Sequence, residues 1–260
     1  MSLTMDACTL HGLREQDMEY FYQPIYHVGV GAVDKAEVLL RVRNGEGGFF
    51  DTEQVVTLAE ELGLIDAWDK RTFIHTCKVL PEFHRHGIRQ LSVNLSPTAC
   101  SNPELVPEIR RILAETNTDP SSICIEVTEV AKLINETQFV DAVQELYDLG
   151  IHIAIDDFGK GYSNLQRIIS IPFHTLKLDK SLVWGMGENS LAEPLVGNMV
   201  DFAQRNKISV VAEGIETALQ QEKLSDMGCQ YLQGYYISPP ISQEMLFAFM
   251  AVQGAPSALR

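Results

Sequence analysis

The chain has 260 residues, of which 45 % are hydrophobic, and its formal net charge is −15. This charge argues against binding to a long nucleic acid, because such binding requires a broad basic surface. No run of about 18 apolar residues occurs, so we expect no membrane segment. The five cysteines form no CxxC pair, which indicates neither a disulfide framework nor a zinc site.

Short apolar runs alternate with longer amphipathic runs, a pattern that is typical of βα units and a mainly parallel sheet. In chain order, the short runs predict strands at Gln90–Leu95, Ile123–Val127, Ile151–Ile155, Thr175–Leu178, Ser209–Ala212 and Tyr231–Leu232. The amphipathic runs predict helices at Pro103–Thr116, Thr137–Leu149, Glu193–Asn206 and Ala218–Met227. Gly150 and Gly228 follow two of these helices, where helix-terminating residues are expected.

Every predicted strand carries a polar side chain at or next to its carboxyl end. In chain order these residues are Asn94, Glu126, Asp156 and Asp157, Lys177 and Asp179, Glu213 and Gln233. Parallel strands place these ends at the mouth of a closed barrel, or along one edge of a doubly wound open sheet. The pattern favours the barrel and leaves the open sheet as an alternative. A single acid after a strand is commonly a helix N-cap, but six such strands in succession indicate a functional site.

Carboxylates and amides dominate this set, which contains no histidine or cysteine. Ligation by oxygen alone favours Mg²⁺ or Mn²⁺ over zinc. The adjacent acids Asp156 and Asp157 could serve two ions, as a two-metal phosphodiesterase requires. Lys177 could orient the attacking water, or it could form a salt bridge that holds two carboxylates apart.

The loop after the double aspartate, Phe158–Ser163, contains two glycines. Gly159 and Gly161 allow positive φ and hence a tight loop over the site. Neither GxxxxGK[ST] nor GxGxxG occurs, so the loop is not a phosphate-binding loop of those two kinds.

These residues lie in motifs whose order resembles that of the EAL domain family. The motifs are YQPI (Tyr22–Ile25), EVLLR (Glu37–Arg41), AEELGLI (Ala59–Ile65), SVNLS (Ser92–Ser96), EVTE (Glu126–Glu129), DDFGKGYSNL (Asp156–Leu165), KLDKS (Lys177–Ser181), AEGIET (Ala212–Thr217) and QGYYISPP (Gln233–Pro240). Each motif alone is weak, but all nine in order are specific. The resemblance implies an α/β fold, a modified (β/α)8 barrel of the TIM type in which one strand is antiparallel.

The resemblance also implies roles for individual residues. Two metal ions would be held by Glu37, Asn94, Glu126, Asp156, Asp157 and Glu213, with Asp156 shared between them. Lys177 would help to hold the hydrolytic water, so Glu37, Asp156, Lys177 and Glu213 are the implied catalytic residues. Glu129 would anchor the loop after the double aspartate. Substrate contacts are implied for Gln23, Arg41, Glu216 and Gln233, with Arg41 contacting a phosphate.

Some positions depart from the family pattern. Val38 stands in the namesake triplet, which reads EVL, and Lys160 replaces the usual threonine of the loop. The rim that follows Arg41 is glycine-rich over Asn44–Phe49. None of these changes removes an implied ligand, but Lys160 and the rim could alter rate and affinity.

The implied activity is hydrolysis of the bacterial second messenger cyclic di-GMP to linear pGpG, by a cyclic-guanylate-specific phosphodiesterase. The alternative is a catalytically weak domain that acts as a cyclic di-GMP receptor or as a protein-interaction module. Hydrolysis of another phosphodiester is a third possibility. Because inactive members commonly lack a ligand and this chain retains them all, the enzyme is favoured.

We expect residues 1–260 to form one domain with its core at about 20–250, and the first ten residues to lie outside the fold. Met1–Asp6 has no basic or apolar stretch and so does not resemble a signal peptide. The residues contain no GGDEF or sensory segment, although such domains could lie elsewhere in the native protein. A cytoplasmic bacterial homodimer is expected. Its interface would use Tyr162–Pro172, with the apolar residues Leu165, Ile168, Ile169 and Ile171.

Overall fold

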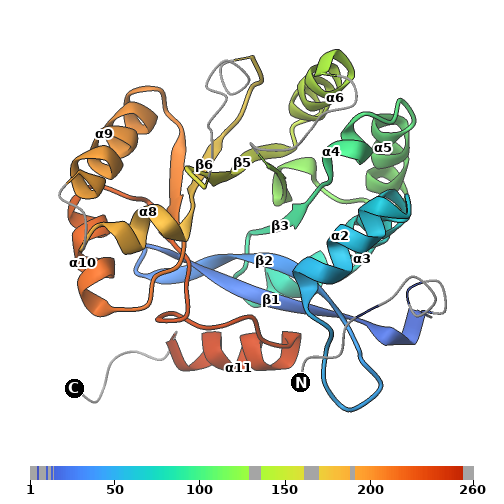
Figure 1. Ribbon diagram of the computed structural model, residues 1–260, viewed down its shortest axis with the longest axis horizontal. Coiled ribbons are helices and arrows are strands. Elements are labelled where there is room, and N and C mark those ends of the chain that lie inside the picture. Colours follow the sequence, from blue (N-terminus) through green and yellow to red (C-terminus); the bar gives the residue numbers. More distant parts are fainter. Residues whose placement is uncertain are drawn as a thin grey trace.

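Eight strands close into a barrel in the computed structural model (Figure 1), which describes residues 5, 10, 13, 15–128, 136–160, 170–187 and 191–253. The strands are β1 (Met18–His27), β2 (Ala32–Val42), β3 (Gln90–Asn94), β4 (Ile123–Thr128), β5 (His152–Phe158), β6 (Thr175–Leu178), β7 (Ser209–Ala212) and β8 (Tyr231–Leu232). They pair in sequence order, and β8 pairs with β1 to close the barrel. The expected barrel is therefore confirmed, and the open sheet is not.

One strand is antiparallel, as the family resemblance implied. The strand β1 runs against both of its neighbours, β2 and β8, whereas all other adjacent pairs are parallel. A short turn after His27 joins β1 to β2, which places Gln23 directly opposite Glu37 in the register. A hairpin of this kind needs only a few connecting residues, whereas a parallel pair needs a long crossover.

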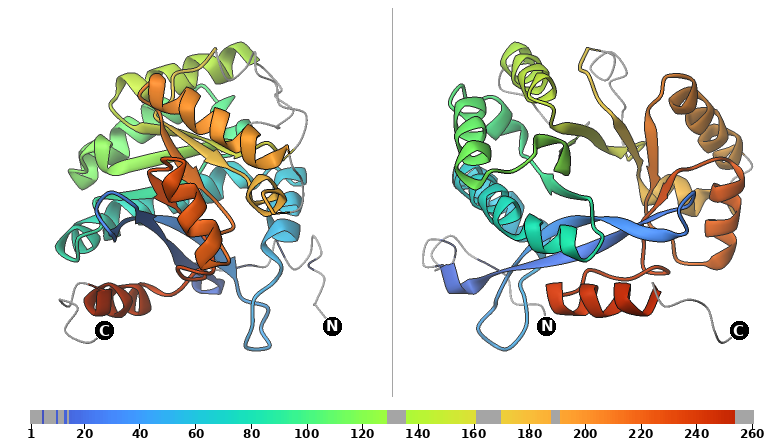
Figure 2. Two further views of the ribbon diagram at one scale, coloured as in Figure 1. Left: turned by 90° about the vertical axis from the view of Figure 1, so that its left-hand side faces the viewer. Right: turned by 180° about the vertical axis from the view of Figure 1, so that it is seen from behind.

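Helices surround the barrel and supply these crossovers (Figure 2). The α-helices in the described residues are α2 (Thr52–Glu61), α3 (Ile65–Arg85), α4 (Pro97–Cys100), α5 (Leu105–Thr116), α6 (Glu136–Asp148), α8 (Lys180–Gly185), α9 (Ala192–Arg205), α10 (Ala218–Asp226) and α11 (Gln243–Gln253). Two 3-10 turns, η1 (Glu15–Asp17) and η2 (Pro120–Ser122), precede β1 and β4. Side-chain caps fix several helix starts. Asp51 caps α2, and Thr217 with Gln220 forms a capping box on α10.

The main hydrophobic core lies between the outer face of the barrel and the helices. Apolar strand residues such as Leu91, Ile125 and Ile153 are fully buried there, against helix residues such as Phe83 and Leu146. Burial on the outer face leaves the inner face of each strand free for polar side chains at its carboxyl end. None of the helices in the described part of the chain has both the length and the apolar composition needed to span a bilayer.

All six predicted strands are present, and β3, β4 and β5 differ from their predicted ranges by one to three residues at an end. The sequence patterns did not single out β1 and β2, whose hairpin lacks the long helical run that marks a βα unit. The four predicted helices correspond to α5, α6, α9 and α10.

Candidate metal and phosphodiester site

The mouth of the barrel collects the polar residues that end its parallel strands. Asn94 ends β3 opposite Glu126 of β4, and Asp156 lies near the carboxyl end of β5 opposite Thr128. The other contributors are Lys177 in β6, Glu213 after β7 and Gln233 after β8. Because neighbouring parallel strands end at the same side of the sheet, residues far apart in the sequence meet here.

Lys177 lies at the centre of this group, and its side chain is almost fully buried, at 2 % exposure. Four carboxylates surround it. The distances from its Nζ are 2.6 Å to Glu126 Oε2, 2.8 Å to Glu213 Oε1, 3.1 Å to Asp156 Oδ1 and 3.4 Å to Glu37 Oε2. One ammonium group thus holds in a single cluster four acids that lie in, or directly after, four different strands.

Amide side chains fix the position of Glu37. Asn94 Nδ2 donates a hydrogen bond of 2.9 Å to Glu37 Oε1, and Gln233 Nε2 donates one of 2.7 Å to Glu37 Oε2. Gln233 Nε2 also lies 3.1 Å from Gln23 Oε1. After Gln233, the chain passes so close to Ile215 that a Cβ at position 234 would collide with its main chain, so only Gly234 fits.

The charges in this cluster do not balance. Burial raises the pKa of Glu213 to about 8 and raises the pKa of Glu126 and of Asp156, despite the neighbouring ammonium group. Burial opposes the charged form of Lys177, but Asp156, Glu126, Glu213 and Glu37 together keep its pKa well above the ordinary value. Lys177 therefore stays protonated, and the excess of carboxylates calls for further positive charge.

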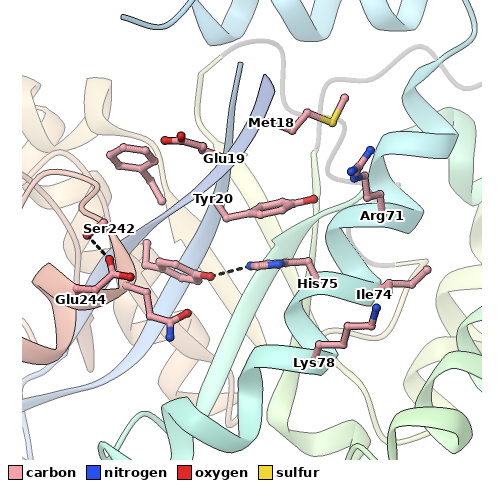
Figure 3. Close-up of a pocket in the computed structure, with 12 residues that line it drawn as sticks. Met18, Glu19, Tyr20, Arg71, Ile74, His75, Lys78, Ser242 and Glu244 are labelled. Atoms are coloured by element: carbon pink, nitrogen blue, oxygen red, sulfur yellow. Dashed lines mark hydrogen bonds between the residues drawn. The ribbon is translucent and has the colours of Figure 1, made fainter. Parts of the chain in front are cut away.

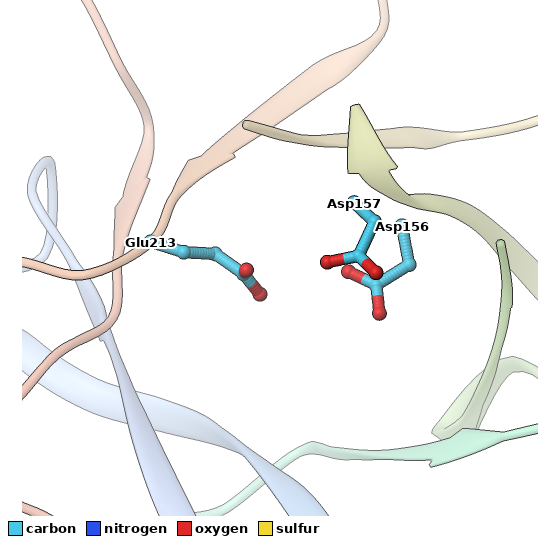
Figure 4. A group of neighbouring side chains, drawn as sticks. All are labelled: Asp156, Asp157 and Glu213. Carbon is cyan, nitrogen blue, oxygen red and sulfur yellow. The ribbon is translucent and has the colours of Figure 1, made fainter. Parts of the chain in front are cut away.

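Three carboxylates could receive this charge from a metal ion. Asp156, Asp157 and Glu213 each offer one oxygen, and these oxygens lie within 4.8 Å of one another (Figure 4). Asp156 Oδ1 is buried and, although it lies near Lys177, accepts no hydrogen bond from the described residues. A set of carboxylate oxygens fits a hard divalent cation, so the residues present suit the implied metal.

Two adjoining cavities extend from the cluster. The first, of about 370 Å³, contacts Glu37, Asp156 and Lys177 and is bordered by Trp184, Glu216 and Tyr235. The second, of about 610 Å³, is bordered by Arg41, Asn94, Asp157, Lys160 and Lys180. Leu39 and Lys180 line both cavities, so together they form one groove across the barrel mouth.

The structure brings most of the candidate residues together and places the others elsewhere. It brings Gln23, Glu37, Lys177, Glu213 and Gln233 together with the other strand-end residues, and it places Arg41 and Glu216 on the rim of the groove. Asp179 is a helix cap, because its side chain accepts a 2.9 Å hydrogen bond from Ser181 N. Glu129 lies outside the described residues. The metal and substrate roles of these residues stay predictions.

Reasoning from residue patterns alone did not find Glu37 or Gln23. Both lie within the β1–β2 hairpin rather than at a strand end, five residues from Val42 and Met18 respectively. A signal was nevertheless present. Glu37 follows Ala36 and precedes Val38, both of which are buried, and an acid inside an apolar strand requires a polar partner.

A third cavity, of about 520 Å³, lies on the outside of the barrel (Figure 3). It is bordered by β1, α3 and the start of α11, and it shares no lining residue with the groove. Tyr20 stacks on His75 there with ring centroids 3.8 Å apart, and the hydroxyl of Tyr22 lies 2.8 Å from His75 Nε2. These contacts attach α3 to the outer face of β1. This cavity is therefore separate from the candidate site at the barrel mouth.

Comparison with protein families gives one match that covers most of the chain. The family model described as the EAL domain matches residues 8–240. Among curated proteins, "Cyclic di-GMP phosphodiesterase NbdA" of Pseudomonas aeruginosa is 31 % identical over 250 residues, covering 95 % of this chain and 32 % of that protein. "Cyclic di-GMP phosphodiesterase RocR" of the same organism is 28 % identical and covers 92 % of this chain and 61 % of that protein.

Solved structures share the fold. The structure described as "PaMucR Phosphodiesterase, c-di-GMP complex" superposes with a TM-score of 0.82 at 30 % identity, covering 89 % of this chain and 94 % of that one. The EAL domain of Mycobacterium smegmatis DcpA superposes with a TM-score of 0.75 at 27 % identity, covering 94 % of this chain and 100 % of that one. The chain spans about a third of the length of NbdA and of other curated relatives that it matches.

Proposed function

The chain belongs to the EAL domain family, and we propose that it is a metal-dependent phosphodiesterase that hydrolyses cyclic di-GMP to linear pGpG. The observation that carries this proposal is the cluster at the barrel mouth. There Lys177 is enclosed by four carboxylates, and three acids are grouped closely enough to hold an ion. Relatives that are named for this activity support the choice of substrate.

The cofactor that we propose is Mg²⁺ or Mn²⁺, with two ions in each site. Asp156, Asp157 and Glu213 would hold one ion, and Glu37, Asn94 and Glu126 with the shared Asp156 would hold the other. When bound, the metal supplies an activated water and stabilises negative charge on the phosphoryl oxygens. The neutral amides of Asn94 and Gln233 would keep Glu37 oriented before any ion arrives.

We assign Lys177 to the placement of the attacking water. Its ammonium group is buried, stays protonated and already lies within 3.1 Å of Asp156 Oδ1, so it can donate to a water held at the same carboxylates. The salt-bridge interpretation of Lys177 is compatible with this role, because the same contacts also keep the acids in place.

The groove has the chemistry that a cyclic dinucleotide requires. Arg41 and Lys180 supply positive charge for phosphates, and charge-assisted contacts of this kind are stronger than neutral ones. Trp184 and Tyr235 border the inner cavity with exposed aromatic rings, against which purine bases can stack. Gln23, Glu216 and Gln233 supply polar groups for base or ribose edges.

The decisive experiment is product analysis of cyclic di-GMP incubated with the protein and Mg²⁺ or Mn²⁺. We expect pGpG to accumulate, and a panel of other cyclic nucleotides and phosphodiesters to react far more slowly. Binding of cyclic di-GMP without turnover in either metal would instead favour the receptor module. Preferred turnover of another phosphodiester would contradict the proposed substrate.

We also propose a two-fold homodimer that acts in the bacterial cytoplasm, where this messenger is used. Of the four apolar residues expected at the interface, Ile171 is buried in the barrel's own core, at 6 % exposure. Leu165, Ile168 and Ile169 lie outside the described residues. Light scattering at tens of micromolar protein should give the mass of a dimer, and a monomeric mass would contradict this assembly.

A further inference from the structure

The second aspartate of the double-acid motif already has a cation beside it. Lys160 Nζ lies 3.0 Å from Asp157 Oδ2, three residues away in the chain. Asp157 is one of the three acids whose oxygens lie within 4.8 Å of one another (Figure 4). The ammonium group of Lys160 therefore forms an ion pair with a carboxylate that is itself a candidate metal ligand.

The backbone keeps this lysine close to the acid. Asp157 has a φ of 56°, which is uncommon for a residue other than glycine, and Lys160 N–H donates to Asp157 O at 3.1 Å. Gly159, with a φ of 95°, completes the tight turn. Because both charged groups belong to one turn, the ammonium group remains near Asp157 even when their contact opens.

Lys160 and Lys177 differ in their freedom to move. Lys177 is almost completely buried among four carboxylates, so its charge is a fixed part of the site. The Lys160 side chain is 56 % exposed and that of Asp157 is 28 % exposed, and the pair is joined by a single short contact. An exposed pair of this kind contributes little free energy, so a divalent cation can displace the ammonium group.

If Lys160 is displaced from Asp157, its side chain can extend into the outer cavity of the groove. Lys160 borders this cavity together with Arg41 and Lys180, which supply the other positive charges there. Glu53 also lines this cavity and lies near enough to interact electrostatically with the lysine. Movement of the side chain within this cavity would transfer its charge from the candidate metal ligands to the region that we assign to substrate phosphate.

We propose that Lys160 is an exchangeable counter-ion of Asp157. In the metal-free protein it neutralises this carboxylate and competes with the incoming divalent cation. After displacement it joins Arg41 and Lys180 and contacts a phosphate of the bound dinucleotide. The proposal rests on the proposed function, and it assigns Lys160 two opposite effects: it weakens metal binding and strengthens substrate binding.

Calorimetric titration with Mn²⁺ alone, without any nucleotide, tests the first effect. Lys160→Met keeps the aliphatic stem and removes the charge, so it should bind Mn²⁺ about twofold to fivefold more tightly than the wild type, as expected for loss of an exposed ion pair. Lys160→Arg should resemble the wild type. Lys180→Met is the matched control, because it removes a charge from the same groove that is not paired with Asp157; its Mn²⁺ affinity should stay unchanged.

Titration with cyclic di-GMP in Ca²⁺ tests the second effect. Both Lys160→Met and Lys180→Met should bind the dinucleotide several-fold more weakly than the wild type. Equal Mn²⁺ affinity in the wild type and Lys160→Met would overturn the inference, as would an equal gain in Lys180→Met. Either result leaves the proposed function intact if the wild type still binds Mn²⁺ and forms pGpG. A wild type that binds no Mn²⁺ would contradict both proposals.

Discussion

Replacing Lys177 with methionine should destabilise the metal-free protein strongly. The variant keeps the volume of the side chain but leaves Glu126, at 2 % exposure, and Glu37, at 7 %, without their cation. A buried carboxylate in this situation takes up a proton. To keep one carboxyl group of ordinary pKa neutral at pH 7 costs about 4 kcal/mol. This agrees with the loss of about 3–5 kcal/mol that follows when one partner of a buried ion pair is removed.

The melting temperature converts this free energy into an observable. For a chain of this length, each kcal/mol shifts the melting temperature by about 2 °C, so in EDTA Lys177→Met should melt about 6–10 °C below the wild type. Mn²⁺ should narrow the gap, because the variant lacks the ammonium charge that repels the ion and should therefore bind Mn²⁺ more tightly than the wild type does; an ion that binds only the folded state at 100 times its Kd adds about 2.7 kcal/mol. Calorimetry or circular dichroism in EDTA and in Mn²⁺ measures both shifts.

A surface lysine provides the control for this experiment. Lys70 pairs with Glu108 on the outside of the barrel, where both side chains are more than a third exposed. Such a pair contributes at most about 1 kcal/mol, so Lys70→Met should melt within about 2 °C of the wild type. If Lys177→Met were equally stable in EDTA, the carboxylates would not depend on this lysine, and the reasoning about charge balance would be wrong.

The remaining predictions concern metal, substrate and pH. Treatment with EDTA should abolish hydrolysis, Mg²⁺ or Mn²⁺ should restore it, and Ca²⁺ should inhibit, because Ca²⁺ binds with more and longer ligand contacts and is a weaker Lewis acid. Glu37→Ala should lose several orders of magnitude in kcat in a product assay; near-normal turnover would contradict the assigned centre. Arg41→Ala should retain Mn²⁺ binding but weaken cyclic di-GMP binding about tenfold to a hundredfold, because it loses a charge-assisted contact of about 1.5–3 kcal/mol. Burial, with a smaller effect of Lys78, lowers the pKa of His75 to about 4, so its contribution to stability should be complete above about pH 6.5 and be lost as the pH falls toward 4; His75→Gln should have a flatter profile of melting temperature against pH over that window.

The parallel part of the barrel could be predicted from the sequence because each strand there follows the same pattern. An apolar run such as Ile151–Ile155 leads directly into a polar end, and an amphipathic helix follows. The hairpin of β1 and β2 has no such helix, and Glu37 lies in the middle of its strand rather than at the end. The predicted role of Glu37 came from the family resemblance, and its hydrogen-bond partners Asn94 and Gln233 became known only from the three-dimensional arrangement.

Backbone conformation and charge pairing were harder to predict. Gly159 was expected to allow positive φ and does so, at 95°, but nothing in the sequence indicated that Asp157 also adopts a left-handed conformation. Likewise, Lys177 could be recognised as a lysine among acids, whereas its contact with four of them at once depends on how four strands converge. Such convergence is a property of the closed barrel rather than of any local segment.

The antiparallel direction of β1 has a consequence for how this domain can be controlled. In an all-parallel barrel the chain enters at the face opposite the catalytic mouth. Here Met18 pairs with Val42 at the carboxyl end of β2, and Arg43 N–H donates to Asp17 O just beyond it. Any polypeptide joined ahead of Asp17 therefore meets the barrel on the side of the candidate site, next to the strand that carries Arg41. A conformational change in such a neighbour would need to pass only along the rim to reach that site.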